Sequence, residues 1–111
     1  MNSILQTLKE LPEKLYKVDL IGKDLGQFLE DCQSTFDEFV LSYAKERIEE
    51  LDNAVFLARE ERENFKVIKK DVPRSLETRH GLLHYSRRYY QDSETRDYCY
   101  LTDQVLGVEA Y

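Results

Sequence analysis

The sequence predicts an α+β fold: amino-terminal helices that include a long amphipathic helix or helical hairpin, a small antiparallel β-sheet of two to three strands, and a short terminal helix. Three observations favour it. Apolar residues recur at helical spacings of three and four in residues 4–11 and again in residues 25–58, and the segment between them suggests a turn. After Phe65 the periodicity changes, and Val72-Pro73 disfavours helix because the residue before a proline prefers extended geometry. His80-Gly81 then separates two β-rich segments and fits a two-residue hairpin turn.

The helical region predicts a short first helix and a long second one. Ser3 and Gln6 form a capping-box pattern, and Pro12 is expected to interrupt or restart the first helix. Asp24 is the expected cap of the long helix, and no Pro or Gly occurs in residues 27–65. A continuous helix over 24–65 would measure about 63 Å, which is long for a compact domain of this size. Two alternatives are therefore open: the helix breaks near Asp52-Asn53 and folds back, or it protrudes and pairs with another subunit.

The hairpin is expected to pair residues 74–79 with residues 82–90. This register sets Arg74 directly opposite Arg87, and like charges in such a pair are destabilising. We therefore expect an acidic side chain, such as Asp71 or Asp92, or a phosphate group between the two guanidinium groups. A third strand is expected at residues 98–101. Thr102 or Asp103 would then cap a final helix that begins at Gln104.

Charge divides the chain into two regions within what we expect to be one compact domain. Residues 1–65 form an acidic helical region with a net charge of −7 and are a candidate for oligomerisation. Residues 66–111 form the hairpin region with its third strand, and residues 66–90 within it carry a net charge of +5. Because salt screens fields beyond about 8 Å, this basic segment can bind an anion although the whole chain carries −6.

Composition and motifs argue against several classes of protein. No apolar run is long enough for a signal peptide or membrane span, and two distant cysteines without a CxxC motif favour a reducing, cytoplasmic location. We expect Cys32 and Cys99 to be packing residues. His80, His84 and Cys99 lack a metal-ligand spacing and are better explained as turn, surface and core residues, so we expect no cofactor and no metal. P-loop and G-x-S-x-G motifs are absent.

A longer pattern resembles a known family. It consists of Gly81-Leu-Leu-His-Tyr-Ser-Arg-Arg-Tyr-Tyr-Gln-Asp92, a tyrosine-rich segment from Tyr98, and the exit Leu101-Thr-Asp-Gln-Val-Leu-Gly107. This pattern resembles the amino-terminal part of the ISLre-type insertion-sequence transposases, bacterial proteins long described as uncharacterised. The resemblance spans the whole chain, although residues 79–107 carry its specific part. It implies a metal-dependent, carboxylate-based nuclease domain beyond the matched region, so we expect these 111 residues to be non-catalytic.

The leading hypothesis is therefore a non-catalytic amino-terminal module of a transposase-like protein that assists binding of double-stranded DNA. Phosphate contacts require exposed cations, and an aromatic ring can stack or hydrogen-bond. The candidate DNA-binding residues are Lys69, Lys70, Arg74, Arg79, Arg87, Arg88 and Tyr90. Two alternatives are open: a protein-protein or homo-oligomerisation module that uses the long helix, and a free-standing small regulator.

Overall fold

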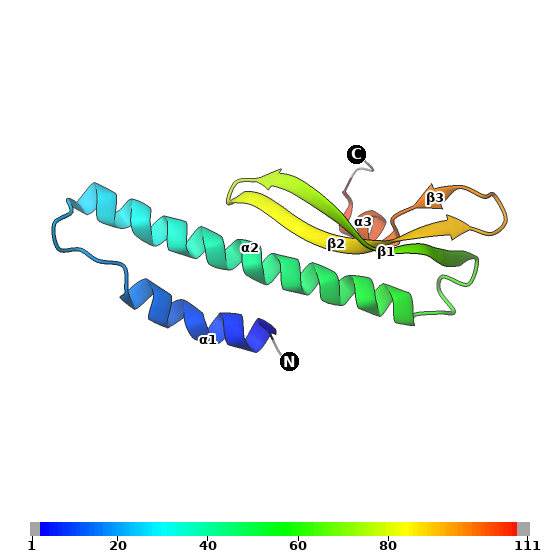
Figure 1. The fold of residues 1–111 in the computed structure, drawn as a ribbon, viewed down its shortest axis with the longest axis horizontal. Coiled ribbons are helices and arrows are strands. Elements are labelled where there is room, and N and C mark those ends of the chain that lie inside the picture. Colours follow the sequence, from blue (N-terminus) through cyan, green and yellow to red (C-terminus); the bar gives the residue numbers. More distant parts are fainter. Residues whose placement is uncertain (1–2, 109–111) are drawn as a thin grey trace. The chain divides into compact units, whose positions relative to one another are not determined.

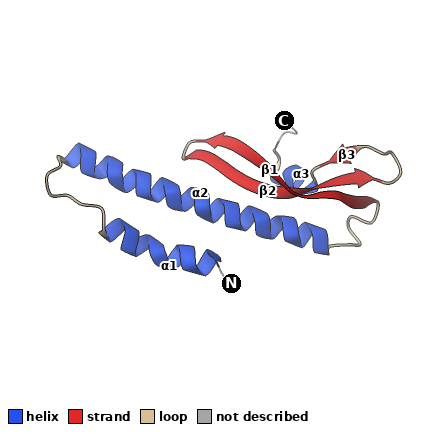
Figure 2. Cartoon of the chain, viewed as in Figure 1, coloured by secondary structure: helices blue, strands red, loops and turns tan. Residues whose placement is uncertain are grey.

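The computed structural model describes residues 3–108 and confirms the α+β fold (Figure 1). Its elements are helices α1 (Ser3–Tyr16) and α2 (Leu25–Leu57), strands β1 (Phe65–Thr78), β2 (Gly81–Asp92) and β3 (Tyr98–Cys99), and helix α3 (Leu101–Leu106). The strands form one sheet in the order β1-β2-β3 (Figure 2).

The chain forms two compact units. The first unit contains the residues up to Glu46 together with the hairpin tip, Leu76–Leu83. The second unit contains Arg47–Ser75 and the residues from His84 onward. Each unit takes residues from the helical region and from the hairpin region, so the boundary at residue 65 expected from charge does not coincide with either unit.

Helix α2 begins where the sequence predicts it and passes the possible break, but it ends at Leu57, short of residue 65. The Asp24 carboxylate caps it by accepting a hydrogen bond from the Gln27 amide at 2.8 Å. The expected break near Asp52-Asn53 is wrong, because α2 is one helix to Leu57. The Asp52 side chain is 5% exposed and is bound by groups outside the helix, so it does not compete for the helix's own backbone. Pro12 likewise lies inside α1 and does not end it.

Strand β1 begins earlier than predicted. It starts at Phe65 instead of residue 74 and passes through Pro73. Proline is tolerated in a strand that lies at the edge of a sheet, because one side of such a strand makes no ladder hydrogen bonds. The sheet order places β1 at this edge. Asp71, two residues before Pro73, has a positive φ of 53°, a backbone conformation that Asp adopts more readily than most residues.

The hairpin turn lies one residue before the predicted position. Strand β1 ends at Thr78 and β2 begins at Gly81, so the turn residues are Arg79 and His80. The predicted turn required a positive φ at both His80 and Gly81, and of these two residues only Gly81 has one (124°). A Cβ atom there would lie 3.2 Å from Leu41 Cδ1, so the backbone conformation and the available space both favour glycine.

This turn also changes the predicted pairing. The side chains of Ser75 and His84 lie 2.6 Å apart, whereas the predicted register set Ser75 beside Ser86. Arg74 is therefore no longer expected directly opposite Arg87. The third strand is confirmed, with Tyr90 paired to Cys99 and Gln91 to Tyr98.

Helix α3 begins at Leu101 instead of Gln104, and its N-cap residue, Tyr100, makes no side-chain capping hydrogen bond. The predicted caps, Thr102 and Asp103, lie inside the helix and are buried. The helix ends at Gly107, whose left-handed conformation (φ 73°) allows its amide to bond a carbonyl of the last turn.

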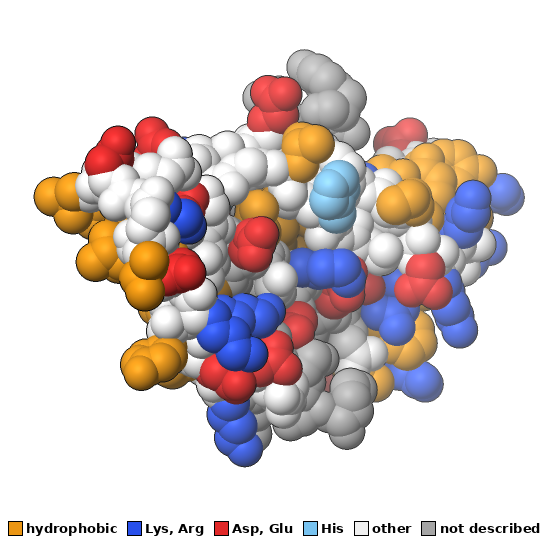
Figure 3. Space-filling view, turned by 60° about the vertical axis from the view of Figure 1, so that its left-hand side comes forward, with side chains coloured by type: hydrophobic (Ala, Val, Ile, Leu, Met, Phe, Trp, Pro, Cys, Tyr) orange, Lys and Arg blue, Asp and Glu red, His pale blue; other side chains and the backbone are white. Residues whose placement is uncertain are grey.

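Few apolar side chains are buried within the part of the chain that the structure describes. Leu83, Tyr85 and Tyr90 are the buried hydrophobic residues, whereas Asp52, Arg87, Thr102 and Asp103 are buried polar ones. Many large apolar side chains are exposed, and Figure 3 shows hydrophobic groups at the surface among charged ones. Polar contacts therefore have an unusually large part in holding the second unit.

Candidate functional site

A buried carboxylate joins both long strands to helix α3 in the second unit. Asp103 is 2% exposed, and its Oδ1 accepts a hydrogen bond from the Tyr85 hydroxyl at 2.7 Å. Its Oδ2 accepts from Arg74 Nη1 at 2.9 Å and from Arg87 Nε at 3.1 Å. Hydrogen bonds between ionised partners are stronger than neutral ones. Asp103 therefore neutralises two arginines that the sequence offered as DNA contacts, and it is the acid that was expected at Asp71 or Asp92.

A second nitrogen of the Arg87 side chain also donates inside the protein. Its Nη1 donates to the carbonyl oxygens of Val72 and Pro73, both at 3.0 Å. Its guanidinium carbon lies 3.6 Å from the centre of the Tyr100 ring, within cation-π distance. Arg87 is 5% exposed. It is a structural residue of the second unit.

A second buried carboxylate joins α2 to β2 and α3. Asp52 Oδ2 accepts from Arg88 Nη1 at 2.7 Å, and Asp52 Oδ1 accepts from the Arg88 amide at 3.1 Å and from Thr102 Oγ1 at 2.7 Å. The Arg88 guanidinium carbon also lies 4.4 Å from the centre of the Phe56 ring. We name this group and the Asp103 group together the carboxylate-arginine cluster; its members are Asp52, Asp103, Arg74, Arg87, Arg88, Tyr85 and Thr102.

Side chains of α2 also accept hydrogen bonds from backbone amides on the open edge of β2. The Ser86 amide donates to Glu49 Oε2 at 2.9 Å, and the Arg88 amide donates to Asp52. Strand β3 pairs with β2 only around residues 90 and 91, so these two amides would otherwise lack a strand partner. Covering an edge in this way removes a template for unwanted strand pairing.

The structure separates the predicted DNA-binding residues into two groups. Arg74, Arg87 and Arg88 belong to the carboxylate-arginine cluster. Tyr90 is 0% exposed, and its hydroxyl has no hydrogen-bond partner among the described groups. Burial, followed by the negative charge of Asp52, raises the pKa of Tyr90.

Lys69 and Lys70 are exposed on β1, together with Lys66, and Arg79 is exposed in the hairpin turn of the first unit. The exposed members of the predicted DNA-binding set, which can reach a ligand, are therefore Lys69 and Lys70 of β1 and Arg79 of the hairpin turn. Lys66 lies four residues before Lys70 and shares its face of β1, whereas Lys69 lies on the other face.

The cluster residues Asp52, Asp103 and Thr102 were not predicted as site residues. Asp52 was predicted only as a possible helix break, and Thr102 or Asp103 was predicted as a helix cap. A signal for Asp52 was present, because it lies four residues after Ile48 and three before Val55, on the apolar side of the helix. No comparable signal marked Asp103.

An aromatic stack lies beside the cluster. Tyr89 stacks on Tyr98 with ring centres 5.3 Å apart, and its ring centre is 4.7 Å from that of Tyr100. These rings and Cys99 line a groove of about 360 Å³. Burial raises the pKa of Cys99, which disfavours the reactive thiolate.

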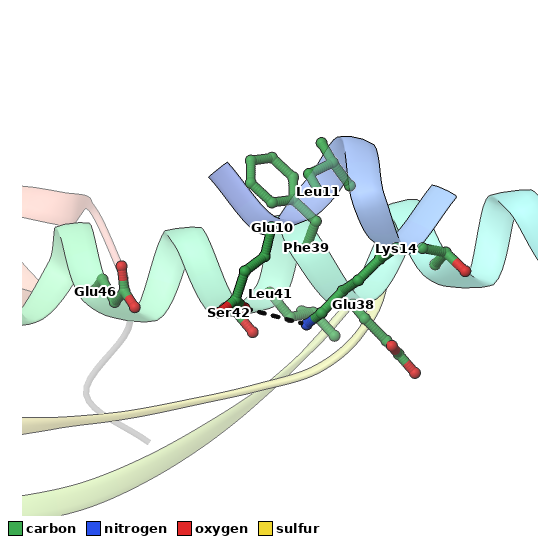
Figure 4. Close-up of a pocket in the computed structure, with 9 residues that line it drawn as sticks. Glu10, Leu11, Lys14, Glu38, Phe39, Leu41, Ser42 and Glu46 are labelled. Carbon is green, nitrogen blue, oxygen red and sulfur yellow. Dashed lines mark ion pairs between the residues drawn. The ribbon is translucent and has the colours of Figure 1, made fainter. Parts of the chain in front are cut away.

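The first unit contains a larger groove of about 450 Å³ between α1 and α2. Leu11 and Phe39 contribute apolar lining, and Glu10 pairs with Lys14 at 3.7 Å beside them (Figure 4). Glu38 and Glu46 add acidic groups.

Two further observations concern residues 3–108. Within this range, no group of three or more His, Cys, Asp or Glu side chains is arranged to hold a metal ion. None of the helices described in it has the length and apolar character required to span a membrane.

The fold and its cluster define a small α+β protein whose second unit is held by buried carboxylates and arginines. The model of the Uncharacterised protein family (UPF0236) matches residues 22–111, and the chain belongs to this family. Neither a curated protein nor a solved structure matches the chain.

Replacing Asp103 with Ala should lower the free energy of unfolding by about 3–5 kcal/mol, because Arg74 and Arg87 would stay buried without their carboxylate. Urea denaturation measures this change. The matched control is Asp97→Ala, an exposed acid in the preceding loop, which should change stability by less than about 0.5 kcal/mol. A cost of less than about 1 kcal/mol for Asp103→Ala would show that the cluster does not hold the fold.

Alkaline pH should destabilise the protein through Tyr85. Burial, together with the hydrogen bond to Asp103 and the charge of that carboxylate, raises the pKa of Tyr85 to about 12 from 10.0. The unfolded chain then loses this proton at lower pH than the folded one, so stability falls as pH rises from about 10 to about 12. Tyr85→Phe should reduce this slope in urea denaturation, whereas the exposed control Tyr98→Phe should reduce it less. Equal slopes for wild type and Tyr85→Phe would contradict the assignment.

Proposed function

We propose that the chain is a non-catalytic module of a transposase-like, cytoplasmic protein and that β1 assists DNA binding. The observation that carries the DNA contact is the exposure of Lys66, Lys69 and Lys70 on the outer strand of the sheet. The resemblance of residues 79–107 to ISLre-type transposases supports the choice of DNA as the anion.

The three lysines suit phosphate contacts for a physical reason. Each ammonium group that neutralises a phosphate releases condensed counterions, so binding tightens as salt falls. Lysine contacts of this kind position a protein on a duplex without reading its sequence. Arg79 is exposed and is a further candidate for such a contact.

The arginines that were predicted to contact DNA and are paired inside the protein support the DNA-binding strand instead of touching DNA. Arg74, Arg87 and Arg88 hold β1 and β2 in place through Asp103 and Asp52. The proposal gives Tyr90 no stacking role, because its ring is fully buried. The proposed DNA contact therefore includes fewer of the residues that the sequence predicted.

A second candidate function, protein-protein association, has its own support. In the first unit, Leu25, Leu29 and Phe36 of α2 are 66%, 55% and 46% exposed. Apolar side chains grouped along one helix mark interaction sites more often than isolated ones do. The two functions are compatible within one protein.

The DNA proposal predicts a salt-dependent change in one variant. The triple substitution of Lys66, Lys69 and Lys70 by Gln should weaken binding to short duplexes of any sequence. It should also reduce the log-log salt slope by roughly one for each lost phosphate contact. The matched control replaces Lys9 and Lys14 of α1 and Lys17, which directly follows it, by Gln; these three lysines are also exposed. Fluorescence anisotropy at several salt concentrations measures both variants, and equal slopes for wild type and the β1 variant would remove β1 from the interface.

The non-catalytic part of the proposal has a separate test. Purified protein incubated with supercoiled plasmid and Mg²⁺ or Mn²⁺ should leave the plasmid intact, as followed by agarose electrophoresis. Nicking that copurifies with the protein through several columns would overturn this part. It would leave the salt-slope experiment unaffected.

A further inference from the structure

Helix α2 presents an uncharged stripe within the first unit. Between Leu25 and Tyr43 its members follow one another at spacings of four, three, four, three and four residues, which is the seven-residue repeat of helices that pair with one another. The members of this stripe, named the α2 stripe below, are Leu25, Leu29, Cys32, Phe36, Phe39 and Tyr43.

Other elements of the first unit occupy the sides of the stripe. Phe39, with Thr35 and Ser42, lines the groove that faces α1. On another side of α2, Asp37 Oδ1 lies 2.9 Å from His80 Nδ1 of the hairpin tip. Among the described residues, the amino-terminal part of the stripe is left accessible: Leu25, Leu29 and Phe36 keep about half of their surface or more.

The charges of this segment favour a second copy of the chain over a basic partner. Residues 25–44 contain four acids and no bases. The acids are Glu30, Asp31, Asp37 and Glu38, and none of them belongs to the stripe. Asp31 pairs with Lys23, and Asp37 with His80, so two of these charges already have partners in the first unit.

The positions that flank a paired seam are also uncharged. In the seven-residue repeat these flanking positions are Gly26, Phe28, Gln33, Thr35, Val40 and Ser42. In coiled coils, charges at these positions set partner choice, and like charges there oppose pairing. A basic partner would find no acid at the seam, whereas a second copy would meet no repulsion despite the net charge of −6.

We propose that two copies of this chain associate through the α2 stripe, with Leu25, Leu29 and Phe36 buried at the interface. The inference deepens the second candidate function by naming its partner, and it is independent of the DNA contact. The interface would bury six large apolar side chains, three from each copy. The free energy gained on association rises in proportion to the apolar area that is removed from water.

Sedimentation velocity over a range of concentrations tests the proposal with the full chain. Wild type should pass from monomer to dimer as concentration rises. Leu29→Glu should raise the dissociation constant by at least about 100-fold, because it removes two leucines from the interface and places two carboxylates there. Ser34→Glu, the matched control, adds the same charge at an exposed position outside the stripe and its flanks and should leave the dissociation constant within about threefold of wild type.

A second variant tests whether a weaker dimer results from the lost interface and not from loss of folding. Leu25→Glu places an acid in the first turn of α2, where the helix dipole favours it, so the helix itself should be retained. It should also weaken the dimer, with an unchanged far-ultraviolet circular dichroism spectrum. A monomeric wild type at all concentrations, or a dimer unaffected by both variants, would overturn the proposal. Leu29→Glu should leave the salt slope of DNA binding unchanged. The dimer proposal and the DNA proposal can therefore fail independently of each other.

Discussion

The second unit depends on a single physical constraint: arginines taken out of water must meet carboxylates with good geometry. Asp103 provides this for Arg74 and Arg87, and Asp52 provides it for Arg88. Because Asp103 lies on α3 and its partners lie on β1 and β2, the pairing fixes three elements that share little apolar surface. Such pairs contribute little net stability compared with apolar contacts, yet removing one partner is costly. They favour one arrangement over its alternatives.

The same constraint explains why the sequence misled in one respect. A run of basic residues between 66 and 90 is consistent with a DNA-binding surface and with a set of buried ion pairs, and only the distant acids distinguish the two. Asp103 lies 29 residues after Arg74, and Asp52 lies 36 before Arg88. Local spacing carries no information about contacts at that separation. The predicted like-charge pair left an acid or a phosphate open between Arg74 and Arg87; Asp103, an acid that was not named there, binds both arginines, although the two are not directly opposite each other.

Local physics did predict the element types. Helical periodicity and the Asp24 cap located α2, and the change of period located the hairpin and the third strand. The errors occurred where tertiary contacts override local preference. Asp52 is a poor helix former, yet its buried partners keep it helical. Pro73 suggested the end of a segment, yet an edge strand accommodates it. The turn moved by one residue because Gly81, not His80, adopts the positive φ.

The first unit raises a different question, which concerns how α2 is stabilised between Leu25 and Glu46. Most helical stability in proteins comes from packing of an apolar side instead of intrinsic propensity. In this unit α1 and the hairpin tip contact the sides of α2, while Leu25 and Leu29 keep more than half of their surface. If this side of α2 faced only water, charged residues at these two positions would not lower the stability of the helix. A side that is apolar, uncharged at its flanks and regular in its seven-residue repeat supports the proposal that two copies of the chain pair through α2.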